Sequence, residues 1–431
     1  MNRPFSLGKV LFNRIRAYPP EDVTSRCPQE APAEAVGLTR RDVDRIWNAV
    51  VRYYRVGIQP AIAVCMRRRG QVFLNRAVGH ARGNGPEDPP GTPAEAATPD
   101  TLFNFFSGSK AVTAMLVHLL DEQGRLRVDD PVAEYIPEFA RHGKEAITIR
   151  HVLNHRAGIP GLPPDAVDLD LLTDPERIIE ILCDAKPESR PGRDLAYHAI
   201  TGGFLLAEIC RRTTGRDLRT YLDEQVRKPL GFRTLSYGVD RADLPRVARE
   251  SFTGLPPVFP FSMLVRRALG LSLQDVVRMA NDERFLTGVV PSGNVIGTAN
   301  EVCRFFELLV RGGELDGVRV FDRRTVVRAV IEQSYHEMDR IIMLPVRYGV
   351  GFMLGSEKLS FYGPDTPRAF GHIGFTNVIA WADPERDISV AIMNNGKPLV
   401  TPEVLLWLEI MRTIARTIPR DSCAQWSDCF T

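Results

Sequence analysis

Short apolar runs bounded by turn residues occur toward both ends of this chain, and runs of this kind predict β-strands. Two runs near the amino end meet at a turn around Gly70, and two near the carboxyl end flank a turn at residues 383–387, which indicates a hairpin. The expected strands are residues 61–67, 71–79, 348–354, 378–382 and 388–393.

The middle of the chain has the apolar period of α-helices instead. One helix is expected to begin near Ser107 and to run to Gln123, because apolar residues recur every three or four positions and Gly124 follows as a stop. Further helices are expected at residues 147–154, 175–183, 201–213 and 218–226, and beside the strands at residues 39–54 and 402–417.

This order of strands, helices and strands favours one architecture. The simplest is a two-domain α/β fold, in which an antiparallel sheet built from both ends of the chain is flanked by helices and carries an inserted all-helical domain. The sheet domain is expected to comprise residues 37–115 and 291–431, and the helical domain residues 116–290.

Residues 1–36 are expected to be a poorly ordered leader, because they are basic at first and then rich in Pro, Glu and Ala. Leu7, Leu11 and Ile15 nevertheless recur at helical spacing. A helix that contacts another subunit or associates weakly with a membrane surface is therefore the alternative.

Composition narrows the partners and the compartment. The 431 residues suit two domains, and a net charge of +2 gives no reason to expect nucleic acid as a partner. No apolar run is long enough for a transmembrane helix. The seven cysteines are scattered and no secretory signal is recognisable, so a cytoplasmic protein is expected. Nothing in the composition predicts the oligomeric state.

The first candidate for chemistry is Ser107, in Ser107-Gly108-Ser109-Lys110. A serine hydroxyl needs a neighbouring base, and residues three apart on a helix lie on one face, so Lys110 is within reach of Ser107. The pattern alone is weak, because Ser6 begins a second copy and because Ser107 can be an ordinary helix cap. Only the copy at Ser107 follows an apolar run and opens a strongly periodic helix.

Two further sites can join it. Tyr197 follows a Pro-Gly turn, and a tyrosine near cationic groups can shuttle a proton, although it can equally pack at a helix start. The segment Gly371-His372-Ile373-Gly374-Phe375 enters the predicted hairpin. Glycines on a strand let a ligand approach the backbone, where a free N–H can serve as half of an oxyanion hole, although the segment can also be a simple bend.

With these three sites in this order, the chain resembles the serine β-lactamase-related family, which includes class C β-lactamases, DD-peptidases and family VIII carboxylesterases. The resemblance extends from about residue 45 to 415. It is carried by co-linear matches at residues 103–110, 124–137, 147–160, 191–208, 228–232, 292–313 and 371–395.

The resemblance implies a role for each matching residue. Ser107 would be the acylated nucleophile, Lys110 its close partner, and Tyr197 the tyrosine of a Tyr-x-Asn element. The N–H groups of Ser107 and Phe375 would form the oxyanion hole. His372-Ile373-Gly374 would stand where many members have Lys-Thr-Gly, so that His372 and Gly374 face the substrate. Whether Lys110 or Tyr197 is the acylation base stays open.

Two departures bear on the substrate. Ala199 replaces the asparagine of Tyr-x-Asn, which the family uses for the substrate's amide side chain, and His372 replaces a permanently charged lysine that would meet a carboxylate. Both changes favour a small neutral ester over a β-lactam or peptide. A β-lactamase or D-amino-acid-specific peptidase is the alternative enzyme. A catalytically inactive ligand-binding protein on the same fold is the alternative outside enzymes.

No cofactor or metal is expected. His151 and His155 have metal-ligand spacing, but no acidic third ligand accompanies them, and His336-Glu337 lacks a second histidine. Residues 254–273 are unusually apolar, and they are expected either to form an acyl pocket or lid, or to be core of the helical domain.

Overall fold

A computed structural model describes residues 13–89, 91–161, 168–257, 259, 261–399 and 401–421. The second Ser-x-x-Lys copy at Ser6 and the residues Leu7 and Leu11 at helical spacing lie outside the described residues. Within the described ranges, no helix is long and apolar enough to cross a membrane.

The main sheet joins both ends of the chain, as predicted. Strand β2 (Ala61–Arg68) pairs antiparallel with β15 (Ile388–Asn394), so that Cys65 lies opposite Ala391. In order across the sheet, the strands are β1 (Thr24–Arg26), β3 (Gln71–Arg82), β2, β15, β14 (Ile379–Asp383), β13 (Phe370–Ile373), β12 (Met353–Leu354), β11 (Pro345–Tyr348) and β10 (Ser334–Met338), and β4 (Glu95–Ala96) pairs with β3. The antiparallel sheet of the predicted fold class is confirmed.

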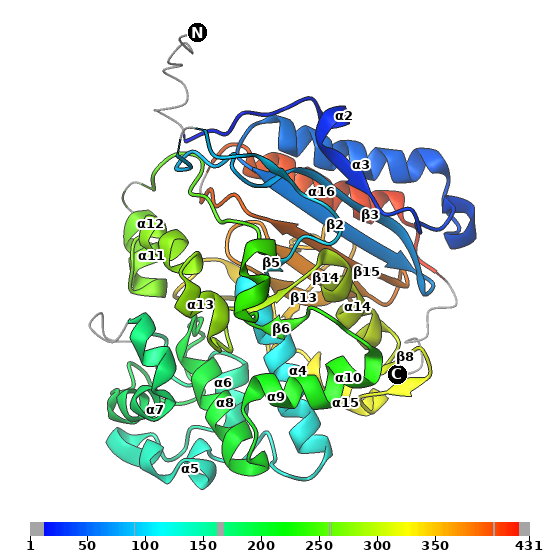
Figure 1. Ribbon diagram of the computed structural model, residues 1–431. Coiled ribbons are helices and arrows are strands. Elements are labelled where there is room, and N and C mark those ends of the chain that lie inside the picture. The colour runs from blue at the N-terminus through cyan, green and yellow to red at the C-terminus, as the bar shows by residue number, and fades with distance from the viewer. Residues whose placement is uncertain are drawn as a thin grey trace.

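Helices cover both faces of this sheet. Helices α3 (Arg40–Arg55) and α16 (Val404–Thr417) lie together on one face, at the top of Figure 1. Side chains alternate along β2: Ile62 and Val64 pack in the core with these two helices, whereas Ala63 packs in the core on the opposite face, which α4 (Ser109–Glu122) and α14 (Ala299–Val310) share. Small residues on that second face let α14 approach the sheet closely.

Residues between α4 and α14 are mainly helical and gather below the sheet in Figure 1. The helices are α5 (Val132–Tyr135), α6 (Ile149–Leu153), α7 (Pro175–Asp184), α8 (Thr201–Thr214), α9 (Leu218–Leu222), α10 (Lys228–Leu230), α11 (Phe261–Leu269), α12 (Leu273–Ala280) and α13 (Glu283–Thr287). Outside this helical region lie α2 (Pro20–Val23), α15 (Arg323–Ala329) and the pair β8 (Glu314–Leu315) and β9 (Val318–Arg319). The proposed division into domains at residues 115–116 and 290–291 stays a prediction.

A second, small sheet supports the start of α4. Strand β7 (Val295–Gly297) lies between β5 (Phe103–Asn104) and β6 (Ser236–Tyr237). Chain segments far apart in sequence therefore meet immediately before Ser107.

Two local expectations need correction. The expected poorly ordered leader is wrong for residues 13–36, because β1 pairs with β3 and Val23 and Val36 are buried in the core beneath it. The strand expected at residues 348–354 is interrupted: Gly351 has φ +98° and lies so close to α4 that a Cβ there would be 2.2 Å from the Ala114 Cβ. This close approach breaks the strand into β11 and β12.

Candidate active site

Ser107 lies in a tight turn that the sequence builds from local contacts. Phe106 adopts the left-handed region with φ +49°, and its N–H donates to Asn104 Oδ1 over 3.0 Å. A single 3₁₀ turn (Phe106–Gly108) then leads into α4. Gly108 is required here, because a Cβ would lie 2.1 Å from the Phe105 ring. Ser107 is thereby presented at the amino end of α4, partly exposed.

Lys110 lies one turn further along, as the spacing predicts. Its Nζ donates to Ser107 Oγ over 3.3 Å and to the carbonyl oxygens of Ala199 over 2.7 Å and Ser292 over 3.1 Å. These acceptors are neutral, so no opposite charge offsets the cost of burying an ammonium. Burial lowers the pKa of Lys110 to about 7, although a small part of the side chain still faces the cleft. A substantial fraction of Lys110 is therefore uncharged at neutral pH.

Tyr197 completes the group around the serine. A hydrogen bond links the Tyr197 and Ser107 side chains, and Lys110 Nζ lies 4.8 Å from the centre of the Tyr197 ring. Burial raises the pKa of Tyr197, and the hydrogen bond to Ser107 opposes that shift only in part. The phenol therefore stays protonated at neutral pH, which makes Lys110 the better base of the two.

Asp339 fixes the position of Tyr197. Its Oδ1 accepts from the N–H of Tyr197 over 3.2 Å and of Ile341 over 2.8 Å, and Tyr348 donates its hydroxyl proton to Oδ2 over 3.3 Å. No local pattern in the sequence pairs residues 142 positions apart, so sequence reasoning missed this carboxylate. Asp339 follows the His336-Glu337 segment, whose pattern indicates nothing beyond an incomplete metal motif.

Three buried histidines surround the same tyrosine. The His155 ring lies 4.7 Å from that of Tyr197 and stacks on His198 at 5.8 Å, and the His372 ring lies 6.2 Å from Tyr197. Burial lowers the pKa of each; His372, with Lys110 as a second cause, falls to about 3. These imidazoles are neutral. No metal-binding group of three or more His, Cys, Asp or Glu side chains occurs in the described ranges.

The two candidate oxyanion donors face the same space. Neither the Ser107 N–H nor the Phe375 N–H has an acceptor among the described residues, and the rings of Phe106 and Phe375 lie 5.6 Å apart. Thr376 and Asn377, which follow, both adopt positive φ, and Asn377 Nδ2 donates to the Tyr53 hydroxyl over 2.8 Å. The strained loop after β13 is thus anchored to α3 while its free N–H stays available.

The remaining predicted residues take different positions. Ala199 lines the cleft and holds Lys110 through its carbonyl. Gly374 packs against the nucleophile turn, because a Cβ there would lie 2.4 Å from the Phe105 carbonyl oxygen. His372 is almost fully buried, with Nδ1 2.7 Å from the Ile373 carbonyl oxygen, and does not line the cavity beside Ser107. Its role in binding substrate stays a prediction.

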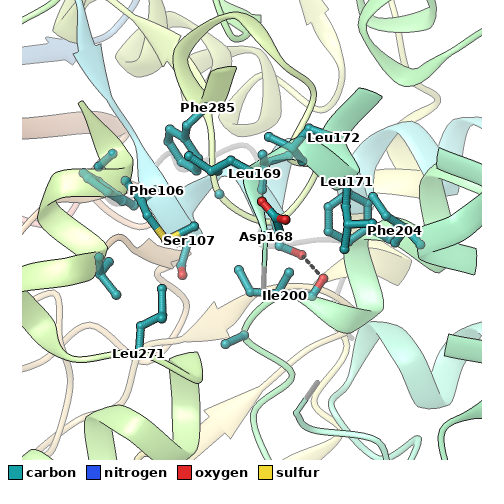
Figure 2. Close-up of a pocket in the computed structure, with 18 of the residues that line it drawn as sticks. Phe106, Ser107, Asp168, Leu169, Leu171, Leu172, Ile200, Phe204, Leu271 and Phe285 are labelled. Atoms are coloured by element: carbon teal, nitrogen blue, oxygen red, sulfur yellow. Dashed lines mark hydrogen bonds between the residues drawn. The ribbon is translucent and has the colours of Figure 1, made fainter. Parts of the chain in front are cut away.

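An apolar cavity opens beside Ser107 (Figure 2). It is bounded by Ser107 and Phe375 on one side and by side chains from the helical region on the other. Leu171 and Leu172 come from the 3₁₀ helix Leu169–Thr173, Phe204 from α8 and Phe285 from α13. Of residues 254–273, Leu271 reaches the cavity, whereas Val265 and Leu273 pack in a small core. The segment therefore contributes both to the cavity wall and to the core, and its role as an acyl pocket or lid stays a prediction.

Comparison with known proteins identifies the family of this chain. A model of the family described as Beta-lactamase matches residues 50–413. Among curated proteins, the chain is 29% identical over 317 residues to "Esterase/beta-lactamase LipL" of Mycobacterium tuberculosis, covering 70% of each chain. It is 23% identical over 395 residues to an N-acetylmuramyl-L-alanine amidase of Bacillus subtilis, covering 87% of this chain and 86% of that one.

Solved structures share the fold over almost their whole length. A penicillin-binding protein homologue from Caulobacter crescentus has a TM-score of 0.74 and 27% identity, covering 88% of this chain and 99% of its own. A family VIII carboxylesterase has the same TM-score of 0.74 and the same coverage at 24% identity. The resemblance inferred from the motifs is confirmed. The names of the relatives include more than one reaction, so the substrate has to be argued from the site.

Proposed function

This chain belongs to the Beta-lactamase family, and from that membership we propose that it is a serine hydrolase that cleaves carboxylic esters through an acyl-enzyme on Ser107. The observation that carries the proposal is the pair formed by Ser107 and Lys110. A buried amine with a pKa near 7 lies 3.3 Å from the hydroxyl that it would deprotonate. An inactive protein on the same fold has no need to keep a buried amine there.

Acylation follows from the positions of these groups. Neutral Lys110 takes the Ser107 proton while Oγ attacks the ester carbonyl carbon. The N–H groups of Ser107 and Phe375 hold the oxyanion of the tetrahedral intermediate. Tyr197, still protonated, gives its proton to the departing alkoxide and regains one from the Lys110 ammonium, so an alcohol leaves and an acyl-enzyme remains.

Deacylation uses the same groups in reverse. Lys110, neutral again, takes a proton from water as the water oxygen attacks the acyl carbonyl. The proton then returns to Ser107 Oγ as the acid is released. Each turnover consumes one ester and one water, and the residues end in their starting protonation states. The proposed chemistry needs no cofactor.

The surroundings of Ser107 support an ester rather than a β-lactam or a D-alanyl peptide. Ala199 offers no side-chain partner to an amide, and His372 is neutral and buried, so it brings no charge to meet a carboxylate. A buried amide left without a partner costs about 1–3 kcal/mol, which corresponds to roughly fivefold to 150-fold in rate. A neutral small-molecule ester has neither an amide side chain nor a carboxylate that needs a partner.

Substrate comparison tests this proposal. We expect kcat/KM for p-nitrophenyl butyrate to exceed that for a chromogenic cephalosporin and for a D-Ala-D-Ala peptide by at least about tenfold. Ala199→Asn restores a side-chain partner for the substrate amide. It should therefore narrow the difference in kcat/KM between the ester and the two amide-bearing substrates. A cephalosporin or peptide value equal to or above that of the ester would replace the esterase proposal with the β-lactamase or peptidase alternative. No turnover of any of them would favour the inactive ligand-binding protein.

A further inference from the structure

We infer that the cavity beside Ser107 is the site of the acyl group and selects straight apolar chains of about six to eight carbons, an inference that rests on the proposed ester hydrolysis. The cavity walls are almost entirely hydrocarbon: Leu171 and Leu172, Ile181 of α7, Phe204, Met279 of α12 and Phe285. In Figure 2, Phe204 and Leu171 lie across the cavity from Ser107. A chain extending from Ser107 would pass between these side chains.

The residues at the mouth determine which half of the ester enters. Ser107 and Phe375, which hold the carbonyl carbon and oxygen, line the cavity, whereas Lys110 and Tyr197 do not. The departing oxygen must face Lys110 and Tyr197 to receive its proton. The alcohol therefore lies on their side, and the other substituent of the carbonyl carbon, the acyl chain, points into the cavity.

Charge favours an uncharged chain. Asp168 is the only ionisable side chain among the described residues that line the cavity, and it is an acid. Its carboxylate repels a second carboxylate on the acyl group. Because Asp168 is exposed, it does not offset the cost of burying a cation among the apolar walls deeper in the cavity.

The volume of the cavity limits the length of the acyl chain. The cavity measures about 150 Å³, the volume of an engineered apolar cavity that binds benzene, a six-carbon group. Each buried methylene raises kcat/KM by up to about fourfold until the space is filled. An acetyl group leaves most of the cavity empty, whereas a palmitoyl group exceeds it.

Chain-length profiles of p-nitrophenyl esters, from acetate to palmitate, test the inference. We expect kcat/KM to rise at least about tenfold from acetate to hexanoate or octanoate, and then to fall. Ile181→Trp fills the cavity and should move the optimum to acetate or propionate. Ile181→Ala should move it to longer chains. Ile179→Ala is the matched control, because Ile179 lies on the same helix but does not line the cavity.

The outcomes separate this inference from the proposed function. A flat profile that Ile181→Trp leaves unchanged, with acetate still hydrolysed, would overturn the acyl assignment alone. Equal shifts in the Ile179 and Ile181 variants would overturn it too. Absence of hydrolysis for every ester would overturn the proposed function and this inference with it.

A separate observation carries a second proposal: we propose that Lys397 is a positioning residue that holds both oxyanion N–H groups in place. Lys397 is fully buried, and its Nζ lies 3.1 Å from Oε2 of Glu250, whose side chain is 2% exposed. No hydrogen bond reaches that carboxylate from elsewhere in the described chain. A buried ion pair adds little net stability, so a structural role alone explains it poorly.

Two sets of contacts connect Lys397 to the oxyanion hole. On one side, its Nζ lies 4.7 Å from the centre of the Phe106 ring, directly before Ser107. On the other side, Nζ donates to the Asn394 carbonyl oxygen over 2.9 Å and to its Oδ1 over 3.2 Å. Asn394 Nδ2 in turn donates to the carbonyl oxygen of Asn377 over 2.8 Å, two residues after Phe375. One ammonium group therefore contacts one of the strained segments that carry the free N–H groups directly, and is linked to the other through Asn394.

Three variants distinguish positioning from folding, with p-nitrophenyl acetate as the substrate. Glu250→Gln keeps Lys397 and should retain kcat within about threefold. The double variant Glu250→Gln with Lys397→Met leaves no unpaired charge, and we expect it to melt near the wild-type temperature while kcat falls at least about tenfold and KM changes less than twofold. Asn394→Ala keeps the ion pair between Lys397 and Glu250 but removes the side chain that links Lys397 to Asn377. It should also lower kcat without raising KM.

Wild-type kcat in the double variant, with Asn394→Ala equally active, would overturn the positioning role. A matching rise in KM would do so as well, because it would indicate lost substrate binding rather than a displaced oxyanion hole. If the double variant does not fold, Asn394→Ala alone decides between the two outcomes.

Discussion

Lys110 connects the electrostatics of this site to its chemistry. Burial against carbonyl oxygens lowers its pKa to about 7. The neutral amine is the active form, so kcat/KM for a short ester should rise with pH through about 7 and then level off. Initial rates between pH 6 and 9 measure this, with circular dichroism at each pH as the control for folding. A profile that is flat across this range would remove Lys110 as the base.

Tyr197 should matter for its proton rather than for its ring. Tyr197→Phe keeps the contacts with Lys110 and His155 but removes the hydroxyl that protonates the alkoxide. We expect kcat for an alkyl butyrate to fall about a hundredfold or more, because its alkoxide needs the proton, with an unchanged melting temperature. The loss should be smaller for p-nitrophenyl butyrate, because p-nitrophenolate leaves without being protonated. Near-wild-type turnover of both esters would exclude Tyr197 from the mechanism.

At the scale of elements, the site depends on how closely β13 and its following loop approach the turn before α4. Gly374→Ala would place a methyl group 2.4 Å from the Phe105 carbonyl oxygen. The strand end must move, which displaces the Phe375 N–H, and displacements near 1 Å cost about a hundredfold in rate. We expect kcat to drop by about that factor, with about 1–3 kcal/mol lost in the free energy of unfolding by urea.

Gly351→Ala is the comparison variant, because a Cβ there meets Ala114 in the middle of α4 instead. It should destabilise the fold to a similar degree with a smaller loss of kcat in the folded fraction. Equal kcat losses in both variants would show that general destabilisation, rather than the oxyanion hole, explains the effect of Gly374→Ala.

For the molecule as a whole, buried histidines should make the fold sensitive to acid. Burial lowers the pKa of His118 and His198 to about 4 and that of His372 to about 3. Below pH 6.5 the unfolded chain binds protons at these sites while the folded chain does not. Stability is therefore greatest above pH 6.5 and falls as the pH drops toward the folded-state values, by up to about 1.4 kcal/mol per histidine and pH unit.

Urea unfolding at pH 7 and pH 5 measures this loss. Glu250, whose pKa burial raises to about 7, acts in the opposite sense, because it stabilises the folded state in acid. A single-site comparison separates the two effects. His118 lies on α4 with its Nε2 3.0 Å from the Val350 carbonyl oxygen, and His118→Gln can keep a donor there. The variant should lose less stability between the two pH values than the wild type; an equal loss would contradict the assignment.

How far the sequence predicts this molecule depends on whether a feature is local. The strands predicted at residues 61–67, 71–79, 378–382 and 388–393, the helix after Ser107 and the Ser107–Lys110 spacing are local patterns, and the structure has them close to where the chain predicts them. Asp339 contacts Tyr197 and Lys397 contacts Phe106, which are far away in sequence. No pattern in the residues next to Asp339 or Lys397 predicts these contacts. The break between β11 and β12 likewise depends on Ala114, a residue on another element.

The packing of residues 13–36 also depends on partners distant in sequence. Their composition suggested a loose leader, yet three of them complete the sheet beside β3. An edge strand this short carries no clear alternation, so its pairing is fixed by the neighbouring strand rather than by its own residues.

The central claim is the covalent acyl-enzyme on Ser107, and intact-protein mass spectrometry tests it most directly. Enzyme mixed with excess p-nitrophenyl hexanoate and quenched in acid within the first turnovers should gain the mass of one hexanoyl group. Proteolytic mapping should place that group on the peptide that contains Ser107. Ser107→Ala should show no added mass and lose at least about a thousandfold in kcat. An acyl group on another residue, or full activity in Ser107→Ala, would contradict the account.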